Sequence, residues 1–500
     1  MFGLGLAIIG QWGNVSQSQS QSSQPKGTFF ARSYPLFLVR LILFCALPAC
    51  LRRQHPAFLP QSSIDTQYQP PLLLITSSSL SLFRLSFMAF SASMISVFSF
   101  FIVFWPLIHQ FRAHNLGSPK AFLFPVTKDA STLQYLTQIR LGGSIPLTLV
   151  LDLNGRHLWT SLAPSTRPLV PFHSFHCISA DGKNMRGGTV CGVVSENSVS
   201  GATAVSELSE GAVAFVSSQR SSIPAIHQLL FAHAPSSLLN RLTIGARGML
   251  GMGRAPTALP EQLSAAASGG DRRFFLCLSE SDGVIVAGGD WPYSSSPPLR
   301  GDVSKLMVYA PLSTSERETT GEYSLNLKAI EVNRERLTLN LNSSSLLLST
   351  VVPFMTMQSA IYTAFTGAFA KAAAAMNMTR IQGRPSDHFE LCFSSDSISK
   401  TPKVGSLVPE IDFVLQSEIV RWRIHGWNSM VRVNDEVTCL GVRDGGPEQR
   451  SGVVMGGHQL EDVLMEFDLG ASMVGFSRSL LLSQRSCSDF SLSSSLTASL

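Results

Sequence analysis

One acidic residue at the end of an apolar run most constrains this sequence. Residues 147–153 read Leu-Thr-Leu-Val-Leu-Asp-Leu, which is typical of a buried strand. Asn154 and Gly155 follow, and this pair predicts a tight turn where the strand ends. Asp152 therefore lies at a strand-to-turn junction with few polar neighbours in the sequence. Burying a lone carboxylate costs free energy unless a second group shares the site, so a second acid later in the chain would be informative.

Length and composition favour a globular protein with two lobes. The chain has 500 residues, of which 45% are hydrophobic and 14% are charged. That length exceeds what a single core usually covers. The formal charge of +5 comes from residues 1–117, which hold seven of the 38 basic residues and one of the 33 acidic ones. The remaining 31 basic and 32 acidic residues give a charge of −1, so we expect no nucleic-acid partner.

The amino-terminal part has a different character from the rest. Residues 1–87 are rich in Ser, Gln and Pro without sustained periodicity, so we expect a disordered extension or sequence upstream of the true start. An apolar run at 94–108 is short for a membrane span and similar to the core of a signal peptide. We therefore predict a signal-peptide-like segment at 88–117 and no membrane contact in the mature form. A membrane anchor is the alternative.

Several segments of the body resemble one plant protein group. The Asp152 loop is similar to the Asp-Thr-Gly loop of pepsin-like aspartic peptidases, with Leu153 and Asn154 in place of Thr and Gly. Residues 125–135, 152–159 and 431–476 resemble the extracellular dermal glycoprotein, basic 7S globulin and xylanase-inhibitor group. Asn154 and His157 are departures from its usual Asp-Leu-Gly-Gly-Arg-Phe-Leu-Trp.

The resemblance implies an all-β, bilobal pepsin-like fold, in which two β-barrel-like lobes face a central cleft. We expect the lobes at 118–302 and 303–490. The run 248–254, Gly-Met-Leu-Gly-Met-Gly-Arg, is similar to the strand that passes beneath the first loop of this fold. A phosphate-binding loop is the rival interpretation, but no Gly-Lys-Ser/Thr follows. The Ala-rich stretch 359–375 predicts a helix.

The resemblance also implies that catalysis is lost. Residues 346–353 stand where the second catalytic loop belongs, and Ser349 takes the place of its Asp. Aspartic peptidases need two carboxyl groups that share a proton, so Asp152 and Ser349 are interpreted as relics of a dyad. The chain contains no Asp-Thr-Gly or Asp-Ser-Gly. No Tyr lies between Tyr135 and Tyr293, so the tyrosine expected on a hairpin over the cleft is also absent.

Cysteines and sequons suit a secreted glycoprotein. The resemblance implies a Cys392–Cys439 bridge in the second lobe and a Cys277–Cys487 bridge to the tail, which leaves Cys177–Cys191. A reduced cytosolic protein is the alternative. A further family bridge is missing, because Leu162 and His233 stand where the group has cysteines.

Two sequons begin at Asn342 and Asn377, which we predict as glycosylation sites. No Cys or His cluster has zinc spacing, so we expect no metal and no cofactor. The expected location is extracellular, in the apoplast or cell wall.

The resemblance finally implies a protein partner. Inhibitors of this group insert loop side chains, often Arg, into the cleft of microbial glycoside hydrolases. A guanidinium can pair with both carboxylates of such an active site. Arg380 and Arg450 lie where such loops belong and are predicted to bind the glycoside hydrolase, with a solvated loop charge as the alternative for each. Arg254 and Arg443 are weaker candidates.

We thus expect a secreted, inactive aspartic-peptidase homologue that inhibits a xylanase or a xyloglucan endoglucanase. A storage or ligand-binding glycoprotein of the basic 7S globulin kind is the first alternative. An active aspartic endopeptidase, recognised by pepstatin-sensitive cleavage at acid pH, is the second. The lost cysteines leave one more alternative, a decayed gene product that folds poorly.

Overall fold

A computed structural model describes the greater part of the chain beyond residue 121. The described residues are 122–142, 145–162, 168–185, 187–217, 225–266, 272–288, 291, 307–313, 321–339, 341, 344–383, 386, 388–401 and 405–490. The expected extension at 1–87, the signal-like segment at 88–117 and Asn342 lie outside them, as does nearly all of the stretch 290–302 around the expected lobe boundary. Within these ranges no helix combines the length and the apolar character that crossing a membrane requires.

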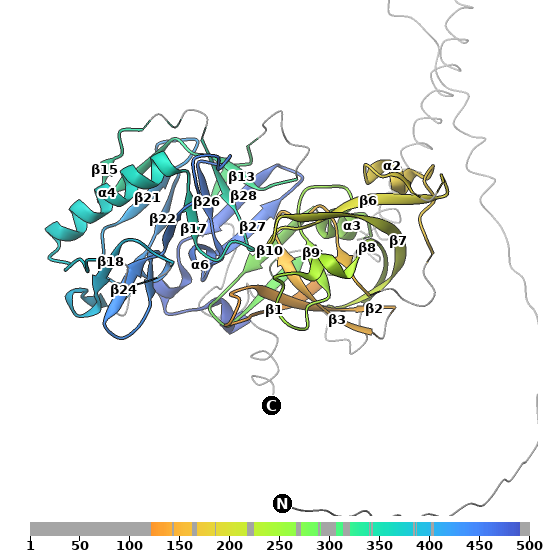
Figure 1. The fold of residues 1–500 in the computed structure, drawn as a ribbon, viewed down its shortest axis with the longest axis horizontal. Helices are drawn as coiled ribbons and strands as arrows, with labels where there is room; N and C mark the ends of the chain where they lie inside the picture. Colours follow the sequence, from red (N-terminus) through yellow and green to blue (C-terminus); the bar gives the residue numbers. More distant parts are fainter. Residues whose placement is uncertain are drawn as a thin grey trace, which may run out of the picture. The chain divides into compact units, whose positions relative to one another are not determined.

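Six antiparallel strands from both halves of the chain form one shared sheet (Figure 1). In spatial order they are β12 (Met307–Pro311), β28 (Met473–Ser477), β27 (Leu464–Asp468), β10 (Arg273–Cys277), β11 (Asp282–Ala287) and β1 (Phe122–Lys128). The pairing of β10 with β27 joins the halves, and Phe274 stacks on Phe467 across it with ring centroids 4.5 Å apart. The carboxy-terminal strands β27 and β28 therefore belong to a sheet common to both lobes.

The first lobe continues this sheet with mostly buried strands. They are β2 (Tyr135–Leu141), β3 (Ile145–Asp152), β9 (Gly248–Gly251), β4 (Trp159–Thr160), β8 (Ala225–His233), β7 (Ala202–Ser217), β6 (Val190–Asn197) and β5 (Lys183–Met185). Short helices α2 (Phe175–Ser179), η1 (Ser236–Leu239) and α3 (Leu259–Ala266) accompany them. The longest of these strands is β7, which has 16 residues and pairs with both β6 and β8.

The second lobe consists of smaller sheets. The first holds β13 (Ser324–Asn326), β16 (Ser345–Leu348), β26 (Val453–Met455), β17 (Met355–Met357) and β25 (Val442–Asp444). The second holds β15 (Glu335–Arg336), β14 (Ala329–Val332), β21 (Ile411–Val414) and β22 (Arg421–Ile424). The others are β18 (Cys392–Ser394) with β24 (Val437–Leu440) and β23 (Met430–Arg432), and β19 (Lys400–Thr401) with β20 (Gly405–Ser406).

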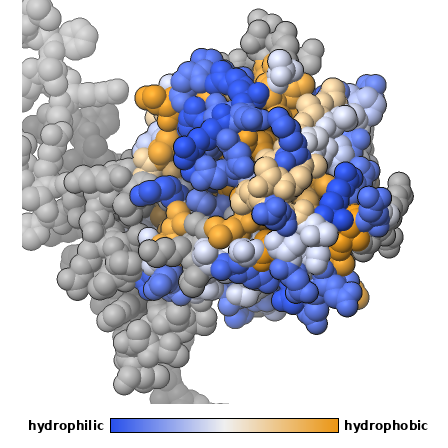
Figure 2. Space-filling model, turned by 90° about the vertical axis from the view of Figure 1, so that its left-hand side faces the viewer, coloured by the Kyte–Doolittle hydropathy of each residue, from blue (hydrophilic) through white to orange (hydrophobic). Residues whose placement is uncertain are grey.

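The second lobe also carries most of the helical residues. They form α4 (Ser359–Ala375), η4 (Ser395–Ser397), α5 (Gly426–Ser429), α6 (Gly457–Leu460), η5 (Leu480–Ser483) and η6 (Cys487–Phe490). The helix expected at 359–375 is confirmed with the same bounds. Its apolar side chains recur at helical spacing and face the core, among them Ile361, Phe365 and Phe369. On the face of the molecule that carries α4, hydrophobic residues are interspersed with hydrophilic ones (Figure 2).

An internal two-fold repeat places the two loops of interest. In the first lobe β9 pairs parallel with β3 and antiparallel with β4, and β4 pairs parallel with β8. In the second lobe β26 pairs parallel with β16 and antiparallel with β17, and β17 pairs parallel with β25. Residues 153–158 and 349–354 are the loops at equivalent positions. A Cβ on Gly251 would lie 2.5 Å from the carbonyl oxygen of His157, so the crossing strand needs glycine there.

The described residues contain three disulfides, and they are the pairs that the resemblance implied: Cys177–Cys191, Cys277–Cys487 and Cys392–Cys439. They span 14, 210 and 47 residues. The Cys277–Cys487 bridge ties η6 to the shared sheet, where Phe490 packs edge-on against Trp291. At the site of the missing family bridge, Leu162 packs partly buried against the main core instead.

The number of residues between its two cysteines predicts how much each disulfide adds to the free energy of unfolding. Replacing both Cys277 and Cys487 by Ala should lower the free energy of unfolding by about 5 kcal/mol, and replacing both Cys177 and Cys191 by about 3 kcal/mol, since the longer loop restricts the unfolded chain more. Urea denaturation of the two variants measures both losses. An equal or reversed order would contradict the chain-entropy explanation.

Candidate functional site

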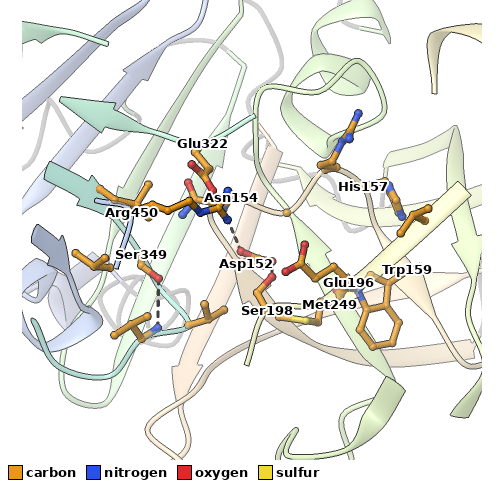
Figure 3. Close-up of a pocket in the computed structure, with 17 residues that line it drawn as sticks. Asp152, Asn154, His157, Trp159, Glu196, Ser198, Met249, Glu322, Ser349 and Arg450 are labelled. Carbon is orange, nitrogen blue, oxygen red and sulfur yellow. Dashed lines mark hydrogen bonds between the residues drawn. The ribbon is translucent and has the colours of Figure 1, made fainter. Parts of the chain in front are cut away.

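A cleft of about 400 Å³ lies over the two equivalent loops and is walled by both lobes (Figure 3). The first lobe supplies the Asp152 loop and the β6–β7 hairpin, and the second supplies the Ser349 loop and the segment before β26. The residues that line it are Asp152, Asn154, Gly155, Arg156, His157, Trp159, Val194, Glu196, Ser198, Met249, Glu322, Leu347, Ser349, Val351, Val352, Arg450 and Val454. The structure thus brings together three of the predicted residues: Asp152, Ser349 and Arg450.

Asp152 ends β3 and is almost completely buried, with 2% of its surface exposed. The backbone N–H of Asn154 donates to its Oδ1 at 3.0 Å, which closes the turn after the strand. The Ser198 hydroxyl donates to its Oδ2. Ser198 lies in the turn that joins β6 to β7, so this bond fastens the hairpin over the Asp152 loop.

Burial raises the pKa of Asp152 to about 6. The hydrogen bonds from Ser198 and from the Asn154 N–H oppose that shift because they favour the charged form, while the nearby Glu196 adds to it. Near pH 6 the carboxyl group is therefore divided between its neutral and charged forms. Desolvation is thus the main reason that this group holds a proton, with a smaller contribution from the charge of Glu196.

Ser349 follows β16 at the place that corresponds to Asp152. Its N–H donates to the carbonyl of Met455 on the crossing strand at 3.0 Å, and its Oγ accepts from the Val352 N–H at 3.3 Å. The side chain is 3% exposed. The other acids among the lining residues are Glu196 and Glu322, and neither stands at this position. The second loop thus offers a hydroxyl group to the cleft where the first loop offers a carboxyl group.

Two side chains tie the loops of the lobes to each other. Thr350 Oγ1 donates to the carbonyl of Leu151 at 2.8 Å and accepts from the N–H of Leu153 at 3.0 Å. Leu153 stands at the place equivalent to Thr350 and has no hydroxyl group, so it cannot return these bonds. Asn154 bonds the second lobe instead: its Nδ2 donates to the Leu348 carbonyl at 2.8 Å, and its Oδ1 accepts from the Tyr323 N–H at 2.9 Å.

His157 forms a second buried polar contact beside the cleft. Its Nε2 lies 3.1 Å from the Ser195 hydroxyl on β6, and Ser195 is fully buried. Burial lowers the pKa of His157 to about 4, with a smaller contribution from Arg156. The imidazole is therefore neutral above that pH and serves as a hydrogen-bonding partner inside the first lobe.

The remaining predicted residues lie elsewhere. Arg380 is exposed beside β18, and its backbone forms an isolated antiparallel β-bridge with Phe393. It is not among the residues that line the cleft. Asn377 is exposed at the end of α4 in a left-handed conformation, with φ of 60°. The sequon is thus accessible. No group of three or more His, Cys, Asp or Glu side chains within the described ranges could hold a metal ion.

Sequence reasoning missed three contributors to this site. Ser198 and Glu196 reach Asp152 from a hairpin about 45 residues further along the chain, which only the strand pairing reveals. Asn154 looked like part of a turn and a departure from a family pattern. The sequence signal for this role is the side-chain amide of Asn154. The Gly usual at that position has no side chain that could form a hydrogen bond with another segment.

Comparisons with known proteins agree with this architecture. The family model described as "Xylanase inhibitor N-terminal" matches residues 135–289, and "Xylanase inhibitor C-terminal" matches residues 322–478. A protein of Nicotiana benthamiana named probable aspartic proteinase GIP2 is 36% identical over 75% of this chain and 93% of its own. Basic 7S globulin 2 of Glycine max is 30% identical over 77% of this chain and 93% of its own.

Two solved structures share the fold. The crystal structure of edgp has a TM-score of 0.67 and 38% identity, and it covers 75% of this chain and 98% of its own. The crystal structure of basic 7S globulin from soybean has a TM-score of 0.64 and 30% identity, with 74% and 98% covered. The expected all-β, bilobal pepsin-like fold is thereby confirmed.

The bonds of Asn154 allow a direct test of how the lobes are joined. Asn154→Ala leaves the Leu348 carbonyl and the Tyr323 N–H without these partners, so the free energy of unfolding should fall by about 1–3 kcal/mol. Asn240→Ala, at an exposed position, is the matched control and should change it by less than about 0.5 kcal/mol. Urea denaturation gives both values, and equal losses would refute the bridging role.

The shifted pKa values of Asp152 and His157 predict opposing pH effects. Folded Asp152 binds a proton more tightly than the unfolded chain, so its contribution to stability falls as pH rises from 3.8 to about 6. Folded His157 binds a proton less tightly, so its contribution rises as pH rises from about 4 to 6.5. Each effect is on the order of 3 kcal/mol, and the two nearly cancel.

Single variants should reveal each effect. Relative to wild type, Asp152→Asn should gain stability as pH rises from 4 to 6, and His157→Gln should lose it. Denaturant midpoints at several pH values measure the slopes, and the double variant, which should be as flat as wild type, is the control. Identical slopes in all four proteins would contradict the two assignments.

Proposed function

This chain belongs to the xylanase-inhibitor family, and we propose that it is a catalytically inactive member that binds and inhibits a microbial glycoside hydrolase. The observation that carries the proposal is the lone carboxyl group at the centre of the cleft, where Asp152 faces a loop that offers Ser349. The fold of a peptidase is present while the chemistry of the dyad is not.

The geometry argues against peptide hydrolysis. In an aspartic peptidase one carboxylate activates water while its protonated partner polarises the carbonyl group. Ser349 has no carboxyl proton to share, and its Oγ already accepts from the backbone of its own loop. Asp152 accepts a hydrogen bond from Ser198 of the hairpin and has no second carboxyl group facing it with which to share a proton. We therefore expect no acid-dependent cleavage.

Two exposed arginines support a binding role on the second lobe. Arg450 lies between β25 and β26, and its side chain reaches toward Asn154 and Glu322 over the cleft (Figure 3). Arg380 lies in the segment between α4 and β18, close to the Cys392–Cys439 bridge, where the Ile381 N–H donates to the Cys392 carbonyl at 3.0 Å. The anchored Arg380 segment suits a guanidinium that must enter a carboxylate-lined glycosidase cleft without ordering a mobile segment.

A second candidate function is storage or ligand binding. It is favoured by relatives named gamma conglutin 1 and basic 7S globulin 2, which are 31% and 30% identical to this chain. Both candidates share an extracellular location, which we also propose. The three disulfides support it because such bonds persist in oxidising compartments.

Enzyme inhibition tests the proposal directly. The full chain, expressed in a plant secretory host, is titrated against fungal xylanases and xyloglucan endoglucanases, together with Arg380→Ala, Arg450→Ala and the exposed control Arg334→Ala. We expect inhibition of at least one enzyme and a loss of about tenfold or more in at least one of the first two variants, which corresponds to about 1.4 kcal/mol. The control should retain wild-type inhibition.

Two results would overturn the proposal in different ways. A folded protein that inhibits none of the enzymes would favour the storage or ligand-binding candidate. Pepstatin-sensitive proteolysis at acid pH that disappears in Asp152→Asn would show that the chain is an active peptidase.

A further inference from the structure

A second cavity, of about 440 Å³, lies apart from the cleft and shares no lining residue with it. From the first lobe it is lined by Lys128 at the end of β1, by Leu133, and by Glu280 in the turn between β10 and β11. The second lobe contributes β19, β20, α5, β23 and the segment around α6. The Arg380 and Arg450 loops do not line it, so this cavity is independent of the surfaces proposed for enzyme inhibition.

The wall of this cavity presents an exposed tryptophan. Trp427 is 43% exposed, whereas the other tryptophans within the described ranges, Trp159, Trp291 and Trp422, are each at most 3% exposed. One side of the Trp427 ring lies directly on Gly405, since a Cβ there would lie 2.6 Å from the ring atom Cδ2. Gly405 also has φ of +71°, which favours glycine. The ring thus packs against backbone at Gly405, while 43% of the surface of Trp427 stays exposed and can contact a flat apolar surface.

The segment that carries Trp427 is held rigidly. A Cβ on Gly426 would lie 2.0 Å from the Ser406 carbonyl oxygen, so α5 sits against β20 at backbone contact. On the other side of the tryptophan, Asn428 Nδ2 donates to the carbonyls of His458 and Glu461 at 3.0 and 2.9 Å. The platform therefore needs no rearrangement to receive a ligand.

The floor of the cavity is likewise fixed, by a network around Glu461. Its Oε1 accepts from Lys128 Nζ at 2.6 Å and from the Tyr135 hydroxyl at 2.7 Å. Its Oε2 lies 3.4 Å from His458 Nδ1. Because these partners come from β1, β2 and α6, the floor spans both lobes and holds the cavity in a preformed shape.

The charges around the cavity balance. Apart from His458, it is lined by three cationic and three acidic side chains: Lys128, Lys400 and Arg432, and Glu280, Glu461 and Asp462. An ion of either sign would gain little net attraction from such a set. A neutral ligand rich in hydroxyl groups gains hydrogen bonds from both kinds, because a hydroxyl donates to carboxylates and accepts from ammonium and guanidinium groups.

We propose that this cavity is a carbohydrate-binding site, in which a pyranose ring of a neutral oligosaccharide stacks on Trp427. The C–H face of the sugar covers the open face of the indole, and its hydroxyl groups reach the rim at Glu280, Lys400 and Arg432. A protein with this site and the proposed inhibitory loops would bind glycan and enzyme on separate surfaces, so loss of one activity leaves the other intact.

Tryptophan fluorescence provides the assay. The full chain is titrated with neutral hexasaccharides of β-1,4-glucose, β-1,4-xylose and β-1,3-glucose, with oligogalacturonate as the charged comparison. We expect saturable quenching by at least one neutral hexasaccharide, confirmed by calorimetry, and no saturable response to oligogalacturonate. Trp427→Ala should weaken binding in calorimetry by about tenfold or more, and Trp427→Phe should retain part of it, since an aromatic face remains.

Two further variants separate stacking from general effects. Gly405→Ala leaves the indole in the protein but displaces it, so binding should fall although the ring is present. Ile419→Ala removes another exposed apolar side chain, 88% exposed, and should bind as wild type. Absence of binding to every neutral hexasaccharide, unchanged binding in Trp427→Ala, or preference for oligogalacturonate would each overturn the proposal.

Discussion

The hydrogen bonds between the two central loops are the constraint on which the rest of the structure depends. Thr350 Oγ1 bonds both the Leu151 carbonyl and the Leu153 N–H, and the Asn154 amide bonds the Leu348 carbonyl and the Tyr323 N–H. Most of these groups are buried, and a buried polar group that makes no hydrogen bond costs free energy. The loops are thereby fixed against each other, and the cleft, its lining and the approach of Arg450 follow from that arrangement.

The strand arrangement of a pepsin-like peptidase is stabilised by packing that does not depend on catalysis. The repeated crossing of β3 with β9 and of β16 with β26 buries apolar strands at the centre of each lobe, whatever chemistry the loops carry. Asp152 contributes to this packing, because it accepts hydrogen bonds from a backbone N–H in its own turn and from the Ser198 hydroxyl of the hairpin. A carboxyl group with such partners has a structural role that does not depend on catalysis.

Sequence patterns predicted those elements whose structure depends mainly on their own residues. The apolar run before Asp152 predicted β3, and the Ala-rich stretch predicted α4 to the residue. Resemblance to a family placed Ser349 opposite Asp152, which no local pattern could do. Neither route could find contacts made by segments distant in the chain, such as Ser198 on Asp152 or the cavity that joins Lys128 to Trp427. Such contacts are created by strand pairing, so their residues look ordinary in the sequence.

Asp152 has no carboxyl group opposite it on the second loop, where Ser349 stands, and therefore no partner with which to share a proton. Carbon-13 NMR of the protein labelled at aspartate carboxyl carbons, with Asp152→Asn to assign the signal, measures this directly. We expect a single-step titration of Asp152 with a midpoint near pH 6, since desolvation is the main cause that raises its pKa and the charge of Glu196 adds to it. Two coupled steps, as in a dyad that shares a proton, or a midpoint below the usual aspartate range, would contradict it.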